Sequence, residues 1–318
     1  MEEIFFENWA ELWLNSIRGT IKDSTFYNNY RNVVYNHLTP AFGNRKLNEI
    51  LPIDVQSLLY EKSLIYSNDM VLKIRNCLSQ IYKAAIINQK CTLNPCVGIK
   101  LPKGKETKEK PAYTPEQAEL IFEYAYSHRY GVEVQLMLET GISRSELLGV
   151  MWEDIDLKNK VLYICRGVTD IVNHRTGKYE VCIGPTKNKY RARAIPLSDR
   201  ICDILSNVDR FVTVKGKKQP KKYLICNRCG DACSPNNWYK RRYKTFIADM
   251  HNYYAERDID IPMYTPHQLR HTRASIWVNE GKNIYAVAKV LGHSDLDMLR
   301  KRYAHSDVEQ LRKLLEIK

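Results

Sequence analysis

Residues 264–275 read YTPHQLRHTRAS, with two histidines four positions apart. On a helix this spacing puts His267 and His271 on one face, as in the zinc helix of metalloproteases. Zinc-protease chemistry needs Glu after the first histidine, whereas this chain has Gln268, and Arg270 would put a fixed positive charge beside the metal. The preceding Thr-Pro pair predicts a helix start, where the helix dipole favours anions. The stretch therefore indicates a phosphate site held by His267 and Arg270, with a helix cap and an Arg salt bridge as the alternative.

Three other stretches of the sequence decide between these interpretations. Downstream, residues 288–307 read AKVLGHSDLDMLRKRYAHSD and contain His293 and Tyr303. Upstream stand ETGISRSELLGVMWEDID at 139–156 and GPTKNKYRARAIPLS at 184–198. In this order the motifs TG…R…EL, a Lys before IPL, HxLRHTxA, LGHS and a Tyr followed two residues later by His resemble the tyrosine recombinase (phage integrase) family. The resemblance covers residues 113–310 and extends more weakly to 1–100.

The resemblance implies a DNA strand transferase that works without metal or cofactor. Tyr303 would attack the scissile phosphodiester, forming a 3′-phosphotyrosyl bond and releasing a 5′-hydroxyl, and this covalent capture keeps the bond energy for rejoining. Arg270 and His267 would bind the phosphate, with His267 also assisting proton movement at the tyrosine. His293 would donate to a non-bridging oxygen, and Lys187 would protonate the departing 5′-oxygen.

Two of the implied catalytic assignments stay open. The family pattern TGxRxxEL puts Ser143 at the usual arginine position of this chain, and Arg144 follows one place later. We expect Arg144 to serve if the turn is shifted by one residue, and a solvent-facing arginine is the alternative. Lys187 and Lys189 both precede the IPL motif; we favour Lys187 as the acid and Lys189 as a phosphate contact.

The charge distribution also indicates nucleic acid as the partner. The formal net charge is +13, and residues 214–244 contain ten Lys or Arg against one Asp, mixed with aromatic residues. Such a concentration attracts a phosphate backbone, although a solvated loop would have the same composition. The expected DNA contacts are Lys189, Arg191, Lys217, Lys218, Lys221, Lys222, Lys240, Arg241 and Arg242.

Hydrophobic periodicity predicts two domains. Residues 1–100 should form an all-α core-binding bundle, with helices expected over 5–17, 26–43 (stopped by Pro40 and Gly43), 55–65 and 69–89. Residues 101–112 form an expected basic linker. Residues 113–318 should form a mixed α/β catalytic domain, mainly helical with a small antiparallel sheet and a C-terminal tail helix.

Within the expected catalytic domain, helices are predicted over 114–128, 132–141 and 143–156. Strands are predicted over 161–168, 178–184 and 191–198, and helices again from Trp238 to the end. In the tail, Val308, Leu311 and Leu315 form one apolar stripe, which packs on its own domain or on a neighbouring copy.

Several other classes are disfavoured. Nine cysteines at irregular spacing do not suggest a disulfide framework, and Cys226, Cys229 and Cys233 lack a partner pair for structural zinc. No apolar run approaches the roughly 20 residues that span a bilayer, and the N-terminus has no signal-peptide pattern. We expect a cytoplasmic bacterial protein associated with the nucleoid.

These inferences predict a site-specific recombinase that integrates and excises a mobile element through a Holliday junction. It would act as a homotetramer on double-stranded core sites, with directionality or host architectural proteins as further partners. Chromosome or plasmid dimer resolution of the Xer type is the alternative substrate. A decayed DNA-binding protein, marked by Ser143, is the alternative from another class. The short N-terminal domain suggests either a core-type enzyme or a fragment of a larger integrase.

Overall fold

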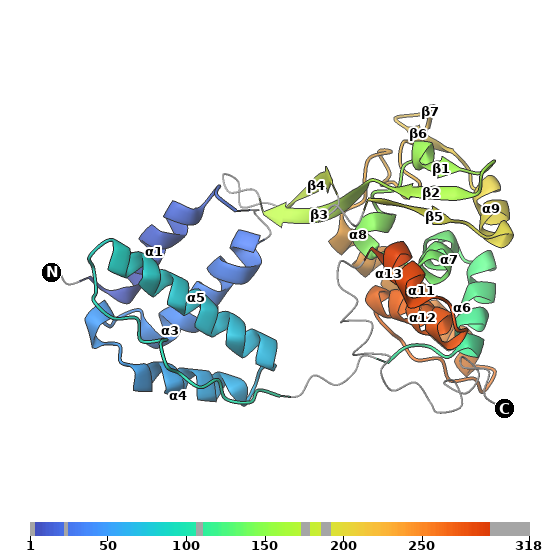
Figure 1. The fold of residues 1–318 in the computed structure, drawn as a ribbon. Helices are drawn as coiled ribbons and strands as arrows, with labels where there is room; N and C mark the ends of the chain where they lie inside the picture. The colour runs from blue at the N-terminus through green and yellow to red at the C-terminus, as the bar shows by residue number, and fades with distance from the viewer. Residues whose placement is uncertain (1–3, 22–24, 106–110, 173–178, 186–191, 293–318) are drawn as a thin grey trace. The chain divides into compact units, whose positions relative to one another are not determined.

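The computed structural model describes residues 4–21, 25–105, 111–172, 179–185 and 192–292, which belong to two compact units (Figure 1). Unit 1 is Met1–Glu109 and unit 2 is Lys110–Lys318. Within the described ranges, no helix is long and apolar enough to cross a membrane.

Unit 1 is helical throughout its described elements, which are α1 (Phe6–Ile17), η1 (Phe26–Arg31), η2 (Val34–Leu38), α3 (Thr39–Phe42), η3 (Leu47–Glu49), α4 (Pro52–Ser63) and α5 (Asn68–Ile87). The long helix α5 lies at the centre of the unit's apolar core. Two buried hydrogen bonds also tie α5 to the rest of unit 1. Trp9 Nε1 of α1 donates to the carbonyl of Ile81 at 3.1 Å, and the Tyr82 hydroxyl donates to the carbonyl of Leu47 at 3.0 Å.

The helix predicted over 26–43 is confirmed in its extent, but one of its two predicted stops is wrong. Pro40 does not stop the helix, which continues as α3 to Phe42 and ends before Gly43. The preceding segments η1 and η2 are wide π-helical turns, and the Thr39 N–H bonds to Val34 O, five residues back. Pro lacks an N–H and crowds the preceding turn of an α-helix. A π-bulge next to it is a known way of relieving such crowding.

Unit 2 combines helices with small sheets, and its elements are α6 (Pro115–Ser127), α7 (Gly131–Thr140), α8 (Arg144–Leu147), η4 (Trp152–Asp154), β1 (Ile155–Asp156), β2 (Val161–Ile164), β3 (Arg166–Val172), β4 (Tyr179–Pro185), β5 (Arg193–Pro196), α9 (Asp199–Ser206), β6 (Phe211–Val214), β7 (Lys217–Pro220), α10 (Pro235–Trp238), η6 (Tyr239–Tyr243), α11 (Lys244–Ala255), α12 (Pro266–Asn279) and α13 (Ile284–Leu291). All described strand pairs are antiparallel, in the order β1-β2-β5, β3-β4 and β6-β7. The fold class predicted from sequence is confirmed.

The three-stranded sheet places β5 where it can reach the helices. Leu162 of β2 pairs with Ile195 of β5, and both side chains are buried in the core of unit 2. Alternate residues of a strand point to opposite faces. Ile195 therefore faces the core, and Arg193, two positions earlier, shares its side of the strand. Figure 1 shows α12 and α13 below this sheet.

The helix predicted over 143–156 is wrong beyond its first turn. Helix α8 ends at Leu147, and the chain then runs extended beside another segment: Leu224 N–H donates to Val150 O at 3.0 Å. Gly149 lies so close to Arg166 that an added Cβ would stand 2.8 Å from its carbonyl oxygen. This packing overrides the helical periodicity of the sequence.

The strands differ from the prediction in two ways. The strand predicted over 161–168 is two strands, because β2 ends at Ile164 and β3, starting at Arg166, joins a different sheet. The β6–β7 hairpin was not predicted. It turns at Lys215 and Gly216, whose φ angles are +50° and +77°, the left-handed pair typical of a tight two-residue hairpin turn.

Candidate active site and nucleic-acid interface

Helix α12 carries His267 and Arg270, the two residues that the sequence predicts to bind a phosphate. Thr265 precedes the helix, and its N–H and hydroxyl both donate to Gln268 Oε1, at 2.8 and 2.9 Å. These bonds fix the first turn, as a capping side chain does. His267, in that turn, is exposed, whereas Arg270, one turn later, is buried.

The guanidinium of Arg270 lies where three helices meet. Its Nη1 donates to the carbonyl of Gly141, at the end of α7, at 2.9 Å. Its Nη2 donates to the carbonyl of Leu291, the last residue of α13. A helix end leaves its last carbonyls without partners inside the helix, and Arg270 satisfies one at each of two ends. The positive charge is thus fixed in the helix turn that follows the exposed His267.

Glu146 of α8 brings a second buried arginine to the same place. Arg193 Nη1 donates to Glu146 Oε1 at 2.9 Å, and Arg270 Nη1 lies 3.6 Å from Glu146 Oε2. The three side chains are 4%, 5% and 2% exposed, respectively for Arg193, Arg270 and Glu146. Arg193 Nε also donates to the carbonyl of Val290. We call Glu146, Arg193 and Arg270 the buried cluster.

The electrostatics of the buried cluster favour an ionised carboxylate. Burial by itself raises the pKa of Glu146, but the hydrogen bond and charge of Arg193, together with the charge of Arg270, outweigh it and lower the pKa below its ordinary value. Two guanidinium groups then face one carboxylate, so the cluster carries a net positive charge. Such a fixed charge in a buried setting suits the binding of a phosphate and the stabilisation of charge that develops on it.

Gly141 lets the helix ends approach this closely. It ends α7 with φ +65°, in the left-handed region, and an added Cβ would stand 2.7 Å from Leu291 Cδ2. Glycine is therefore required twice, by the backbone conformation and by the contact with α13.

The structure separates Ser143 from Arg144. Ser143 is the N-cap of α8: its hydroxyl accepts from the Glu146 N–H at 3.4 Å, and its own N–H donates to Glu146 Oε2 at 2.8 Å. Arg144 is the first residue of α8 and is exposed. Within the described ranges its guanidinium has no hydrogen-bond or ion-pair partner. Arg144 thus extends from the same short turn that supplies Gly141 O and Glu146 to Arg270, but it does not join the buried cluster.

Three of the predicted catalytic residues and two of the predicted DNA contacts fall outside the described ranges. These residues are Lys187, His293 and Tyr303, and Lys189 and Arg191, respectively. Their assignments therefore stay predictions.

The histidine pair and the cysteine triplet do not form a metal site within the described residues. The rings of His267 and His271 meet edge to face, with centroids 4.5 Å apart. Cys226 and Cys233 are buried, whereas Cys229 is exposed. Across the described ranges, no three His, Cys, Asp or Glu side chains are grouped to hold a metal ion.

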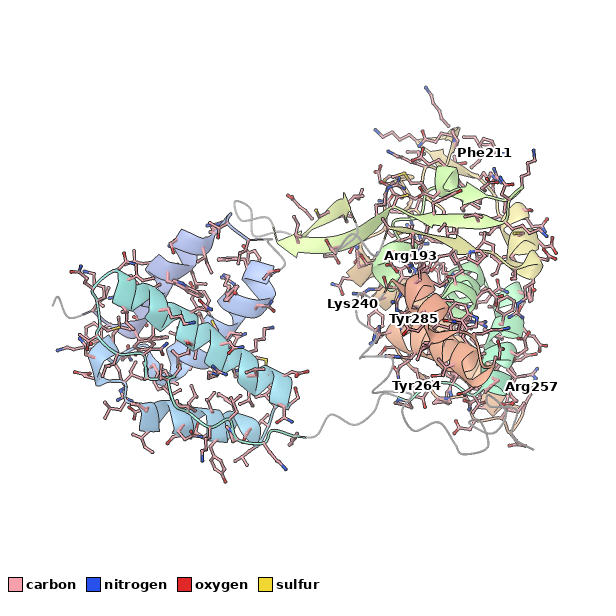
Figure 2. The ribbon with its side chains drawn as sticks, viewed as in Figure 1. Arg193, Phe211, Lys240, Arg257, Tyr264 and Tyr285 are labelled. Carbon is pink, nitrogen blue, oxygen red and sulfur yellow. The ribbon has the colours of Figure 1, made fainter. Side chains whose placement is uncertain are left out.

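The basic segment 214–244 divides into two regions rather than forming one surface. Lys217 and Lys218 are exposed on β7, and Lys240 and Arg241 are exposed on η6. Figure 2 shows Lys240 far from Phe211, which stands on the β6–β7 hairpin. Lys222 is exposed, and Lys221 Nζ donates to Asp209 O at 2.8 Å.

Arg242 differs from its neighbours. Its Nη1 lies 2.7 Å from the buried Glu133, and its Nη2 donates to Cys226 O at 2.5 Å. Trp238 Nε1 donates to the same carboxylate. This placement favours an internal structural role for Arg242 over the predicted contact with DNA.

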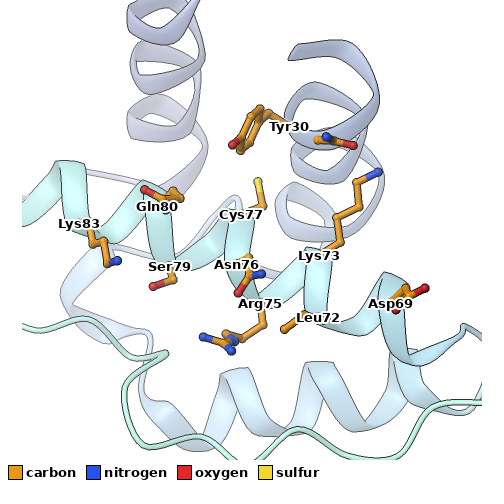
Figure 3. Close-up of a pocket in the computed structure, with 11 residues that line it drawn as sticks. Tyr30, Asp69, Leu72, Lys73, Arg75, Asn76, Cys77, Ser79, Gln80 and Lys83 are labelled. Atoms are coloured by element: carbon orange, nitrogen blue, oxygen red, sulfur yellow. The ribbon is translucent and has the colours of Figure 1, made fainter. Parts of the chain in front are cut away.

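Unit 1 has a polar surface of its own along α5. An open hollow of about 580 Å³ is lined by Asn29, Tyr30, Asp69, Leu72, Lys73, Arg75, Asn76, Cys77, Ser79, Gln80 and Lys83. Figure 3 shows Tyr30 and Lys73 on one side of α5 and Arg75 on the other, with Asn76 between them. Amide and ammonium side chains on one helix suit contacts with base edges and phosphates.

Sequence reasoning missed Glu146 and Arg193 as members of the site. The sequence SRSE at 143–146 is a capping-box signature, so the place of Glu146 at a helix start could have been predicted. No local signal could have paired it with Arg193, 47 positions away.

Comparison with protein families identifies both parts of the chain. A model described as "Phage integrase family" matches residues 112–310. A second model, described as "Phage integrase, N-terminal SAM-like domain", matches residues 5–63.

Curated relatives agree with the family models. The chain is similar to a XerC-like tyrosine recombinase from Caldanaerobacter subterraneus subsp. tengcongensis, with 26% identity over 95% of this chain and 79% of the relative. It is also similar to the transposase of transposon Tn916 from Enterococcus faecalis, with 25% identity over 82% of this chain and 65% of the relative.

Solved structures show the same fold. The Tn1549 transposon integrase in complex with a circular-intermediate DNA has a TM-score of 0.73 and 20% identity, covering 97% of this chain and 98% of that one. A lambda integrase tetramer bound to a Holliday junction has a TM-score of 0.61 and 16% identity, covering 92% of this chain and 78% of that one.

Proposed function

This chain belongs to the phage integrase family and is a tyrosine-type site-specific DNA recombinase; we propose that it integrates and excises a mobile element. The similarity to the Tn916 transposase supports an element as the substrate. The observation that carries the proposed chemistry is the buried Arg270 guanidinium, held by Gly141 O, Leu291 O and Glu146 one turn after the exposed His267.

In the proposed reaction, Tyr303 is the nucleophile. Its oxygen attacks the scissile phosphorus, the bond from phosphorus to the 5′-oxygen breaks, and Lys187 gives that oxygen a proton. The phosphate stays on the 3′-oxygen of the cut strand and is now also bonded to the Tyr303 oxygen. Rejoining reverses these steps with a 5′-hydroxyl from the partner duplex, which produces and then resolves a Holliday junction.

The described residues supply the phosphate-binding part of this proposal. Arg270 is fixed and positively charged, so it meets the charge of the phosphate without reorganising. His267, exposed in the first turn of α12, would contact the phosphate and assist proton transfer at the tyrosine, and His293 would donate to a non-bridging oxygen. Arg144 is proposed as the first arginine, reaching the phosphate from the solvent side of α8.

We propose that unit 1 is the core-binding DNA-binding domain. The α5 surface combines Lys73 and Lys83 with the amides of Asn76 and Gln80. Lysine ammonium groups neutralise phosphates, and Asn or Gln amides can pair with the edge of adenine in the major groove. Residues 101–112 would then link the two DNA-binding parts.

Two exposed groups of basic residues extend the proposed interface on unit 2. One lies on or beside the β6–β7 hairpin (Lys217, Lys218 and Lys222, with Lys221 partly tied to Asp209), and the other lies on η6 (Lys240 and Arg241). Lys189 and Arg191 belong to the proposed contacts by sequence alone. Recombination joins two duplexes, so four copies assembled on DNA are proposed, in the cytoplasm and at the nucleoid. Directionality or host architectural proteins are the proposed additional partners.

Covalent trapping tests the proposed function. Core sites are first selected from randomised duplexes by the full chain and then built as nicked suicide duplexes, in which the cut strand loses its 5′-hydroxyl fragment. Wild type is expected to give a shifted band on a denaturing gel in the presence of EDTA, and Tyr303→Phe is expected to give none. Selected duplexes that bind tightly but never trap would overturn the enzymatic proposal.

A further inference from the structure

We propose that Arg193, the first residue of β5, is a positioning residue that fixes the C-terminal end of α13 for the recombination reaction. This inference rests on the proposed function, because the segment that follows α13 in sequence begins with His293. It concerns a residue that the proposed chemistry does not use.

Arg193 and Arg270 hold consecutive carbonyl groups of α13. Arg193 Nε donates to Val290 O, and Arg270 Nη2 donates to Leu291 O. These are the last carbonyls of the helix, which lack partners inside it. They also lie at the negative end of the helix dipole, where a guanidinium is favourable. Two cations from different elements, β5 and α12, therefore clamp one helix end.

Glu146 sets the direction of both guanidinium groups. Arg193 forms a fork on it, with Nη1 at 2.9 Å from Oε1 and Nη2 at 3.4 Å from Oε2. Fork geometry fixes a guanidinium in its plane, which a lysine ammonium cannot reproduce. All three nitrogens of Arg193 donate to protein acceptors. Its role is therefore to position other groups rather than to touch the phosphate.

The clamp acts at the point where the chain leaves α13. Gly292 ends the helix in the left-handed region, with φ +69°, and its N–H bonds to Lys289 O at 3.1 Å. The last described turn of α13, directly before His293 in sequence, is thus held by the clamp and by the Gly292 cap. Figure 2 places Arg193 beside α13. Misplacement of reacting groups by about 1 Å can reduce a rate by about 100-fold.

The test compares Arg193→Lys with a matched control, Arg166→Lys, in the full chain. Arg166 is also paired with a carboxylate, Asp154 at 2.5 Å, but within the described contacts it does not touch α13. Amide hydrogen exchange is measured without DNA for peptides that cover residues 284–292. Arg193→Lys is expected to speed exchange there, whereas Arg166→Lys leaves it unchanged. Equal exchange in wild type and Arg193→Lys, or equal acceleration in both variants, would overturn the clamp.

Single-turnover cleavage of the trapping duplex gives the second readout. Arg193→Lys is expected to slow cleavage by about 100-fold while the Kd for DNA changes less than about threefold. Loss of DNA binding in parallel with cleavage would contradict a positioning role. If Arg193→Lys does not fold, Glu146→Gln, which keeps shape and weakens the hold on both arginines, is expected to show the same pattern.

A methylphosphonate at the scissile position separates positioning from phosphate contact. It removes the negative charge that a catalytic arginine would stabilise, so a variant of a phosphate-contacting residue loses less on this substrate. Arg193→Lys is expected to slow both substrates by the same factor. A defect that shrinks on the methylphosphonate would overturn the assignment and make Arg193 a phosphate ligand. A wild type that traps neither duplex would overturn the proposed function, and hydrogen exchange would then decide the clamp alone.

Discussion

The carbonyl oxygen of Gly141 accepts a hydrogen bond from Nη1 of Arg270 at 2.9 Å, although the two residues stand 129 positions apart in the chain. The bond ties the C-terminal end of α7 to α12. Leu291, at the end of α13, contributes its carbonyl to the same guanidinium. The geometry of the proposed phosphate site therefore depends on two helix ends, those of α7 and α13, that meet at one side chain of α12.

Gly141→Ala is expected to disturb this meeting point. The residue has φ +65°, and its new methyl group would stand 2.7 Å from Leu291 Cδ2. A left-handed backbone costs a non-glycine residue about 1 kcal/mol, and overpacking commonly adds about 1–3 kcal/mol. Denaturant unfolding should show a loss of about 2–4 kcal/mol. Gly184→Ala is the control, because nothing lies within 4 Å of its added Cβ; equal stability of the two variants would contradict the packing described.

The adjacent residues Arg241 and Arg242 should behave in opposite ways. Arg242→Ala leaves Glu133 buried without its guanidinium partner, and breaking such a pair costs about 3 kcal/mol. Arg241→Ala, on the exposed side, should change unfolding little. It should weaken DNA binding and reduce the slope of log affinity against log salt by about 1. Denaturant unfolding and salt titrations of both variants check this; a salt slope lowered only by Arg242→Ala would reverse the assignment.

Arg144→Ala tests whether Arg144, exposed on α8, takes the role of the arginine that the family pattern has where this chain has Ser143. The variant should fold with wild-type stability, since within the described residues no group depends on that side chain. Covalent trapping should fall by more than about 100-fold, the scale of losing one charged transition-state contact. Arg228→Ala, another exposed arginine of unit 2, serves as the control. Trapping that survives Arg144→Ala would assign the first-arginine role to another residue.

Acid should weaken unit 2 through Glu146. The arginines lower the pKa of this buried carboxyl in the folded chain, so its ionised form stabilises the fold above the unfolded pKa of about 4.3. That contribution is lost as pH falls from this value through the folded pKa. Glu146→Gln should therefore be less stable than wild type at pH 7, and the difference should shrink below about pH 4. Thermal melts between pH 3 and 7 measure it, with exposed Glu256→Gln as the control; a constant difference would contradict the linkage.

Local sequence signals predicted the part of the site that lies on one helix. The Thr-Pro start placed His267 and Arg270 one turn apart on α12, because a cap and 3.6-residue periodicity are local properties. The partners of Arg270 could not be predicted in this way. Gly141 and Leu291 reach it through the packing of three helices, and Arg193 reaches Glu146 from a strand.

The difference between local sequence signals and tertiary packing also explains which predictions were wrong. The periodicity of 143–156 suits a helix, but the close approach of Gly149 to Arg166 makes the chain extended after Leu147. The basic segment 214–244 suggested one DNA-facing surface. Burial of Glu133 draws Arg242 inward, and the β6–β7 hairpin, which includes Phe211 and Lys217, stands away from Lys240 at its Phe211 end. Tertiary contacts, which composition does not encode, decide these cases.

Identification of the residue that becomes bonded to DNA tests the central claim most directly. The trapped complex is digested with nuclease and trypsin, and the peptide that retains a nucleotide is sequenced by mass spectrometry. Trypsin cleaves after Arg302, so Tyr303 begins the peptide 303–312. We expect the nucleotide on Tyr303. Attachment to another tyrosine, such as Tyr285, which is 59% exposed on α13, would contradict it.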